Sequence, residues 1–428
     1  GVFNHTGRDF FAFKDIQHNR ESSQYRDWYC NVNFQGNNEY NDGFSYDNWG
    51  GYNLLVKLNQ HNPAVRKYLL DVVKYWVSEF DVDGIRLDAA DVLDFGFMHE
   101  LRMLANEIKP EFWLMGEVIH GDYSRWVNSD MLHSVTNYQL YKALYSGHNE
   151  HNYFEIAHTV RYLLDKGNLP YHLYNFVGNH DVERIYTRLL NKHEFVPVHI
   201  LMYTLPGIPS IYYGSEFGIE GRKEKHSDVV LRPAINLEDY PNALDENGCT
   251  NIIARLGEIR QKNSVFSDGI YQELRLTNRQ YAFSRTNEIT QAIVVVNNDE
   301  VDSSLDIPAT GTYTELLSGE IQSVDGNLHV HLHACSGQIW MKDYDETVTR
   351  KREVKMPEIK KVAVKEETIE QVTVDYSKSY EEMSIEELQA CVLEKLAKNG
   401  PVTEQMKRDV ANNVYHDSLI NWVKSFRN

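Results

Sequence analysis

The residues whose types suit chemistry stand at the ends of three short apolar segments. In the first, GIRLDAADVLD, Arg86 and Asp88 are two residues apart, so a strand would point both side chains to one face. A guanidinium held beside a carboxylate keeps that carboxylate ionised and oriented, as a nucleophile requires. Ion pairs of this kind are also common in purely structural roles, so a functional interpretation of this pair depends on the other candidate residues.

The two other segments end in residues of the same character. In FWLMGEVIH an apolar run is followed directly by Glu117. A carboxyl group that loses solvation favours its protonated form, which suits a general acid. A surface glutamate at a strand end is the alternative. NFVGNHDVER then gathers Asn179, His180 and Asp181 at one terminus. Three such termini in strand order favour one common site.

Together these residues predict glycoside hydrolysis. Retaining glycosidases hold two carboxyl groups ~5–5.5 Å apart, one as the nucleophile and the other as the acid/base. Neighbouring strands of a sheet lie ~4.8 Å apart, so two successive strand ends can supply such a pair. We therefore expect Asp88 and Glu117 to face each other.

The elements that must position these residues alternate between helices and short apolar strands. Asn62 is a predicted N-cap with Pro63 in the first turn, and apolar residues follow at helical spacing up to Phe80. Later segments continue the alternation, including a predicted strand over HSVTNY, residues 133–138. Apolar strands between helices indicate a parallel sheet covered by helices, and in β/α barrels the chemistry lies at the carboxyl ends of the strands.

The character of the sequence changes three times after this region. Short strands between turn residues follow, then a charge-dense stretch without aromatic residues, then helical patterns opened by a capping box at Ser384 and Glu387. The predicted domains are a partial (β/α)8 barrel at 1–265 with an inserted segment at about 6–60, a C-terminal β-sandwich at 266–342, a charged linker at 343–380 and a small helical tail at 381–428.

The composition of the chain argues against several classes of binding partner. The chain has 428 residues, and 43 basic against 62 acidic residues give a net charge of −19, which argues against nucleic acid and anionic membranes as partners. It contains no apolar run long enough to span a membrane. The four scattered cysteines show no metal-ligand spacing, so neither a metal nor another cofactor is predicted, and a reducing, cytoplasmic location is favoured. Assembly into a homo-oligomer is retained as an alternative to a monomer.

Four motifs carry a resemblance to a known family. GVFNHTG, GIRLDAAD, LMGEV and FVGNHD, in this order and spacing, resemble the conserved regions of the α-amylase family, glycoside hydrolase family 13. The resemblance covers about residues 1–340 and implies a (β/α)8 TIM barrel followed by an all-β C-terminal domain. It also implies that the chain is incomplete at the N-terminus and enters the barrel at the end of its third strand. A barrel missing strands has unpaired edges, so the chain alone is expected to be weakly active or inactive.

The resemblance assigns roles residue by residue. It implies that Asp88 is the nucleophile, that Glu117 is the general acid/base, and that Asp181 binds the distorted sugar. Arg86 would orient Asp88. The substrate-binding positions that it implies are His5, Arg86, Asn179, His180 and His120.

Two further stretches resemble one group within the family. LVKLNQHNPAVRKYLL and QYRDWYCNVNF resemble segments of neopullulanases, cyclomaltodextrinases and maltogenic amylases, which implies maltodextrins, cyclodextrins or pullulan as α-1,4-glucan substrates. A non-catalytic member that only binds glucans, and an α-1,6-glucosidase or transglycosylase, are the alternatives. Trp28, Trp49 and Tyr52 are candidates for stacking on sugars or, equally, for packing within the inserted segment.

Three positions depart from the family pattern. Asp91 stands where many relatives have glutamate, which leaves the balance between hydrolysis and transglycosylation open. Ile119 replaces a tryptophan, so an acceptor-side stacking surface is expected to be missing. Asn4 matches a calcium-binding asparagine, but Val92 replaces the histidine whose carbonyl completes that site, so we predict no calcium there.

Overall fold

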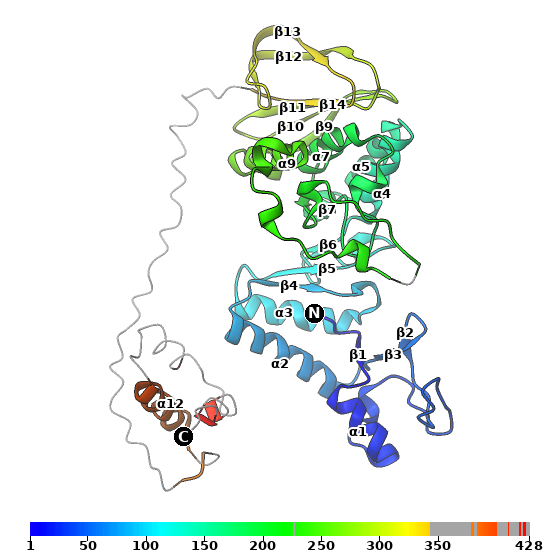
Figure 1. The fold of residues 1–428 in the computed structure, drawn as a ribbon, viewed down its shortest axis with the longest axis vertical. Coiled ribbons are helices and arrows are strands. Elements are labelled where there is room, and N and C mark those ends of the chain that lie inside the picture. The colour runs from blue at the N-terminus through cyan, green and yellow to red at the C-terminus, as the bar shows by residue number, and fades with distance from the viewer. Residues whose placement is uncertain are drawn as a thin grey trace. The chain divides into compact units, whose positions relative to one another are not determined.

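The computed structural model describes residues 1–225, 227–342, 378–380 and 383–399, together with residues 410, 419, 420, 423 and 424. The chain divides into two compact units, Gly1–Lys351 and Arg352–Asn428. The first unit holds all the predicted chemistry. Figure 1 shows its strands and helices by label.

Five short parallel strands follow one another in chain order through the first unit. They are β4 (Gly84–Leu87), β5 (Trp113–Gly116), β6 (Ser134–Val135), β7 (Tyr174–Phe176) and β8 (Ile208–Ser210). Strand β4 pairs with β5 and β5 with β6, a bridge between Thr136 and Tyr174 continues the order to β7, and β7 pairs with β8. The predicted parallel arrangement is confirmed, and it brings the carboxyl ends of these strands to one edge.

Helices cover this sheet on its outer side. Figure 1 shows α2 and α3 side by side against β4 and β5. Helix α2 begins as predicted, because the Asn62 side chain accepts a hydrogen bond from the Ala64 amide with Pro63 in the first turn. The helices of the first unit are α1 (Phe11–Asn19), α2 (Pro63–Phe80), α3 (Phe95–Ile108), α4 (Tyr138–Asn149), α5 (Tyr153–Leu164), α6 (Ile185–Arg188), α7 (Phe195–Thr204), α8 (Ala243–Glu246), α9 (Gly248–Lys262) and α10 (Val265–Asp268).

The opening residues are divided between two sheets. The Gly1 amino group donates to the Arg86 carbonyl at 2.8 Å, and the Gly1 carbonyl accepts from the Asp88 amide at 3.0 Å, on the free edge of β4. Strand β1 (His5–Gly7) instead pairs antiparallel with β3 (Tyr52–Lys57), which also pairs with β2 (Asn48–Trp49). The expectation that GVFNHTG is wholly the end of a barrel strand is therefore wrong for His5, which lies in the small sheet of the inserted segment.

A buried amide pair fixes the chain beyond β6. The strand predicted over residues 133–138 ends at Val135, because the Asn137 side chain accepts from the Leu140 amide and so begins α4. The Asn137 amide also donates to Asn175 Oδ1 at 2.9 Å, and Asn175 donates to the Pro206 carbonyl. These bonds satisfy otherwise orphaned polar groups and connect three strand regions.

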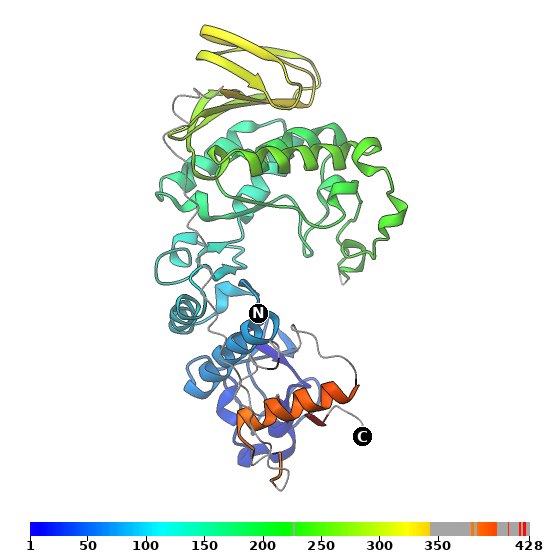
Figure 2. The ribbon, with the colours of Figure 1, turned by 90° about the vertical axis from the view of Figure 1, so that its left-hand side faces the viewer.

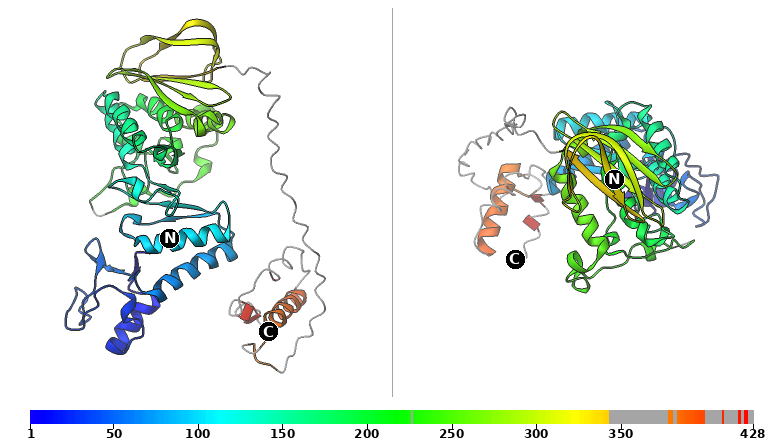
Figure 3. Two further views of the ribbon diagram at one scale, coloured as in Figure 1. Left: turned by 180° about the vertical axis from the view of Figure 1, so that it is seen from behind. Right: turned by 90° about the horizontal axis from the view of Figure 1, so that it is seen from above.

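The C-terminal part of the first unit is a single antiparallel sheet. Its strands are β9 (Ile270–Leu276), β10 (Gln280–Thr286), β11 (Gln291–Asn297), β12 (Ser303–Glu315), β13 (Ile321–Leu332) and β14 (Ser336–Lys342), in the spatial order β13-β12-β14-β11-β10-β9. The hairpin of β12 and β13 lies over the other strands (Figures 1 and 3), with Trp340, Val295 and Leu328 among the buried residues between them. The predicted sandwich thus has two layers, but both belong to one continuous hydrogen-bonded sheet.

Helix α7 joins this sheet to the rest of the unit. It is buried along nearly all of its length, and its apolar residues share a cluster with Val294 and Ile339 of the sheet. Figure 2 shows α9 beside the same sheet, and an irregular segment that projects from the unit between β8 and α9. One apolar core therefore runs from the helices into the C-terminal sheet.

The second unit contains helix α12 (Ile385–Asn399). Its predicted capping box is confirmed, since the Ser384 amide donates to Glu387 and the Glu387 amide donates to the Ser384 hydroxyl. Most of the predicted charged linker, residues 343–377, and much of the predicted tail lie outside the described residues. Among the helices that are described, none combines the length and apolar character needed to cross a bilayer.

One buried carboxyl group gives the first unit a testable pH dependence. Glu194 is 1% exposed, and within the described residues neither of its carboxyl oxygens accepts a hydrogen bond, although His151 Nδ1 lies 3.6 Å from Oε1. Burial, aided by the charge of Glu300, raises the pKa of Glu194 to about 7. Because the folded protein keeps this proton while the unfolded chain releases it near pH 4.5, stability falls as pH rises through that interval.

Glutamine cannot ionise, so we expect Glu194→Gln to remove this loss of stability. The free energy of unfolding of the variant, taken relative to that of the wild type, should rise by about 2–3 kcal/mol between pH 4.5 and 8. Two buried histidines, His148 and His199, have pKa values lowered to about 4 and act in the opposite sense, so the comparison must be between variants. Urea unfolding across this pH range measures the difference. Glu111→Gln, at an exposed position, is the control, and parallel pH curves for wild type and Glu194→Gln would contradict the prediction.

Candidate active site

The two central carboxylates come from neighbouring strand ends and share one arginine. Leu87 lies opposite Gly116 in the β4 and β5 register, so Asp88 and Glu117 are the next residues on the two strands. Arg86 Nη1 lies 3.7 Å from Asp88 Oδ1, and Arg86 Nη2 lies 3.1 Å from Glu117 Oε2. The sequence assigned Arg86 to Asp88 alone, whereas the guanidinium connects both carboxylates.

A strained turn completes the contact between these strands. Ala89, directly after Asp88, has φ 44°, a left-handed conformation that costs a non-glycine residue about 1 kcal/mol or more. The turn lets the Ala89 amide donate to Glu117 Oε2 at 3.3 Å and the Ala90 amide donate to the Glu117 carbonyl at 2.9 Å. The Glu117 side chain is 11% exposed while the Asp88 side chain is 33% exposed, so the two carboxyl groups differ in solvation.

The third carboxylate lies in the loop after β7 and is held from several directions. Asp181 Oδ1 accepts from Arg232 Nη2 at 2.9 Å, and His180 Nε2 lies 3.1 Å from Asp181 Oδ2. Asn179 Oδ1 accepts from the Asp181 and Val182 amides, which shapes the loop. Asp181 and His180 each remain over a third exposed, so a ligand can reach them.

His5 reaches the site from the inserted segment. Its Nδ1 lies 3.3 Å from the Asn4 side-chain amide, and its ring lies 5.8 Å from the Trp49 ring. Burial lowers the pKa of His5, against the opposing effect of the Asp88 charge, so the neutral imidazole can present an Nε2 hydrogen as a donor. The proximity of Trp49, which is 38% exposed, favours a stacking surface there, whereas Trp28 packs against Phe11 and Tyr68.

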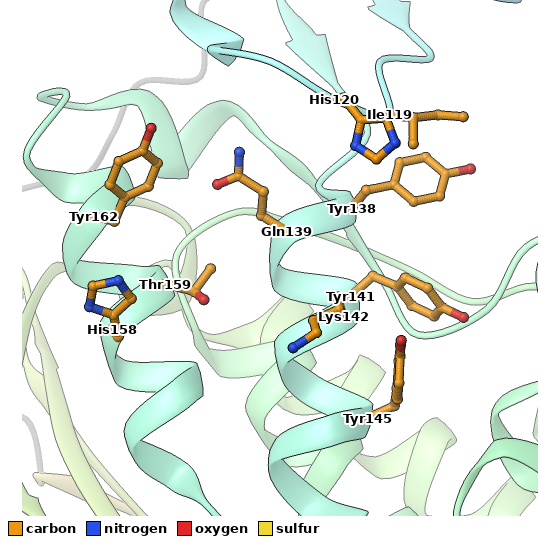
Figure 4. A pocket seen from close by; sticks show the side chains of 10 residues that line it. All are labelled: Ile119, His120, Tyr138, Gln139, Tyr141, Lys142, Tyr145, His158, Thr159 and Tyr162. Atoms are coloured by element: carbon orange, nitrogen blue, oxygen red, sulfur yellow. The ribbon is translucent and has the colours of Figure 1, made fainter.

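A pocket of about 610 Å³ opens beyond Glu117 between α4 and α5. Figure 4 shows Ile119 and His120 at one end, tyrosines of α4 along one side, and His158 and Tyr162 of α5 on the other. His120 therefore lies at one end of this pocket, beside Ile119. The mixture of aromatic and polar side chains suits a sugar chain.

Two residues of this region, Arg232 and Tyr138, are not identified by the sequence analysis. Arg232 contacts Asp181 from the irregular segment after β8, where no periodic pattern points to it. The Tyr138 hydroxyl accepts a hydrogen bond from Asn179 at 3.0 Å, and burial together with the charges of Glu117 and Asp181 raises the pKa of Tyr138 to about 12. The signal for Tyr138 was Asn137, a good N-cap that places the tyrosine in the first turn of a helix.

The fold and this constellation agree with family comparisons. Residues 1–257 match the α-amylase catalytic domain, and residues 275–395 match the all-β domain found C-terminal to it. The chain therefore belongs to the α-amylase family.

Relatives within the family are more specific. The chain is 32% identical to a cyclomaltodextrinase of Thermoanaerobacter pseudethanolicus over 306 residues, which are 69% of this chain and 51% of that protein. It is 30% identical to neopullulanase 2 of Thermoactinomyces vulgaris over 354 residues, 79% of this chain and 58% of the relative. The debranching enzyme of Nostoc punctiforme superimposes with a TM-score of 0.67 at 28% identity, covering 79% of this chain and 74% of that one. The chain thus spans little more than half the length of these two curated relatives.

Proposed function

We propose that this protein is a retaining glycoside hydrolase that cleaves α-1,4-glucosidic bonds through a covalent glycosyl-enzyme. The observation that carries this proposal is the pair of carboxylates at successive strand ends, Asp88 and Glu117, connected by Arg86. Strand spacing of ~4.8 Å matches the ~5–5.5 Å separation that a retaining pair needs. Asp181 supplies a third carboxylate from the loop after β7.

The reaction proceeds in two displacements. Asp88 attacks the anomeric carbon while Glu117 protonates the glycosidic oxygen, so the carbon–oxygen bond breaks and the leaving sugar departs. Glu117 then removes a proton from water, the water oxygen attacks the anomeric carbon, and Asp88 is released. Two inversions at the same carbon restore the α configuration.

The surrounding residues bind and position the sugar. Asp181, fixed by Arg232 and His180, accepts hydrogen bonds from hydroxyls of the distorted ring, and neutral His5 donates one. Asn179 acts through the loop, because its side chain is occupied by Asp181, Val182 and Tyr138. The departing chain lies along the pocket that begins at Ile119 and His120.

Short α-glucans are the proposed substrates: maltodextrins, cyclodextrins or pullulan. The names of the two curated relatives support this class. The exposed Trp49 beside His5 offers one aromatic face for a glucose ring.

Incubation of the chain with maltotriose, β-cyclodextrin and pullulan tests the proposal. Because weak activity is expected, the chain is used at high concentration. We then expect reducing sugar from at least one of the three, and proton NMR should detect the α-anomer of the first product before mutarotation. A β-anomer formed first would overturn the retaining mechanism. Binding of all three without turnover would favour the glucan-binding alternative over a hydrolase.

We also propose a cytoplasmic location, because Cys30, Cys249, Cys335 and Cys391 are all unpaired thiols. Fractionation of the source cells, followed by detection with an antibody to this chain, measures it. Recovery outside the cytoplasm would contradict this part of the proposal.

A further inference from the structure

The edge of the C-terminal sheet carries a row of histidines on one face. In β13 and just beyond it, Leu328, Val330 and Leu332 are buried, so the alternate residues His329, His331 and His333 point to solvent. The buried residues fix this register, because a shift by one residue would bury the imidazoles and expose the core.

Asp302, the residue just before β12, places its carboxylate opposite two of these imidazoles. His333 Nδ1 lies 3.1 Å from Asp302 Oδ2, and His331 Nε2 lies 3.5 Å from the same oxygen. One ligand atom from each of Asp302, His331 and His333 lies within 4.8 Å of the others. Ligands at 2.0–2.1 Å in a tetrahedral zinc site are separated by roughly 3.3 Å, so small side-chain rotations would bring all three to one ion.

Protein partners already hold the outer atoms of the Asp302 and His331 side chains. Asp302 Oδ1 accepts from the Ala334 amide at 3.0 Å, which leaves Oδ2 facing the histidines. The Ser304 hydroxyl lies 3.1 Å from His331 Nδ1, which leaves Nε2 facing Asp302. For His333 the backbone is fixed, because its carbonyl oxygen accepts from the Asn297 and Ser336 side chains. Partners such as the Ala334 amide and the Ser304 hydroxyl orient metal ligands, and the hydroxyl also selects the histidine tautomer.

We propose that Asp302, His331 and His333 form a binding site for a late first-row divalent transition-metal ion such as Zn²⁺. Two imidazole nitrogens and one carboxylate suit Zn²⁺, Ni²⁺ or Cu²⁺, whereas Mg²⁺ and Ca²⁺ prefer oxygen ligands alone. All three side chains are at least half exposed, so a hydrated ion can reach them directly. The bound ion would join the start of β12 to the end of β13 and so stabilise the hairpin.

Calorimetric titration of the untagged, chelator-treated chain with ZnCl₂ tests this site. We expect one Zn²⁺ per chain at low micromolar affinity, weakened about tenfold or more in Asp302→Asn, His331→Ala and His333→Ala. Zn²⁺ should raise the melting temperature of the wild type but not of the double variant His331→Ala/His333→Ala. With Cu²⁺, electron paramagnetic resonance should show hyperfine splitting from imidazole nitrogen that the double variant lacks.

Two other histidines serve as matched controls. His329 lies on the same face and pairs with Asp306, and His18 lies on the exposed surface of α1. His329→Ala and His18→Ala should leave the affinity within about twofold of wild type, since neither is among the three ligands. Equal losses in His329→Ala and His331→Ala would overturn the ligand assignment. Absence of saturable binding, or binding unchanged in the double variant, would overturn the site.

Discussion

Replacing Asp88 with asparagine should reduce hydrolysis of maltotriose by about 10⁴-fold or more, because the amide cannot form the glycosyl-enzyme. The two side chains have nearly the same shape, so the packing around Arg86 is retained. Initial rates of reducing-sugar release measure the loss, and far-UV circular dichroism checks the fold. Asp71→Asn, on the outer surface of α2, is the matched control and should keep wild-type activity.

A small external nucleophile sharpens this prediction. In Asp88→Ala, azide can enter the vacated space and attack α-maltosyl fluoride once, so the product should be the β-maltosyl azide. NMR of the anomeric proton distinguishes it from the α product. Wild-type turnover in Asp88→Asn, or an α-azide from Asp88→Ala, would remove Asp88 from the role of nucleophile.

Replacing Glu117 with glutamine should have the second largest effect, and its size should depend on the leaving group. For maltotriose, kcat/KM should fall by about 10²–10⁴-fold, because a sugar alkoxide leaves poorly without a proton donor. For α-maltosyl fluoride the first displacement should be nearly unaffected, since fluoride departs without full proton transfer. Steady-state values of kcat/KM for both substrates measure the difference, because this ratio reports the first displacement.

Azide again separates the roles of the two carboxylates. In Glu117→Gln the glycosyl-enzyme still forms on Asp88, so azide attack should invert the centre a second time and give the α-maltosyl azide. Glu111→Gln, at an exposed position away from the site, is the control. Equal losses for both substrates would contradict a general acid, because they would indicate a defect in binding or folding instead.

Much of the candidate site could be predicted because it depends on local rules. Residues that directly follow successive parallel strands must meet at one edge of a sheet, and this places Asp88 and Glu117 side by side from sequence alone. The helix start at Asn62 and the capping box at Ser384 are equally local. Such features need only short-range hydrogen bonds or side-chain periodicity.

The parts that were missed depend on contacts between distant segments. Arg232 reaches Asp181 across 51 residues of sequence and from an irregular segment, so no spacing rule points to it. The sequence predicts a sandwich but not the continuity of its sheet, because that continuity depends on the far end of β12 pairing with the distant strand β14 as well as with β13. His5 was assigned to a barrel strand, since pairing with Lys57 cannot be read from a three-residue strand.

The continuous core around α7 has a consequence for how this protein could be divided. A helix buried on nearly every side has no surface to present to water, so α7 stays folded only while the layers around it stay packed. The helices that share its core, α4, α5 and α9, are therefore expected to gain and lose their structure together with the C-terminal sheet. Dividing the chain near residue 265 would separate two named domains but would cut through a core that they share.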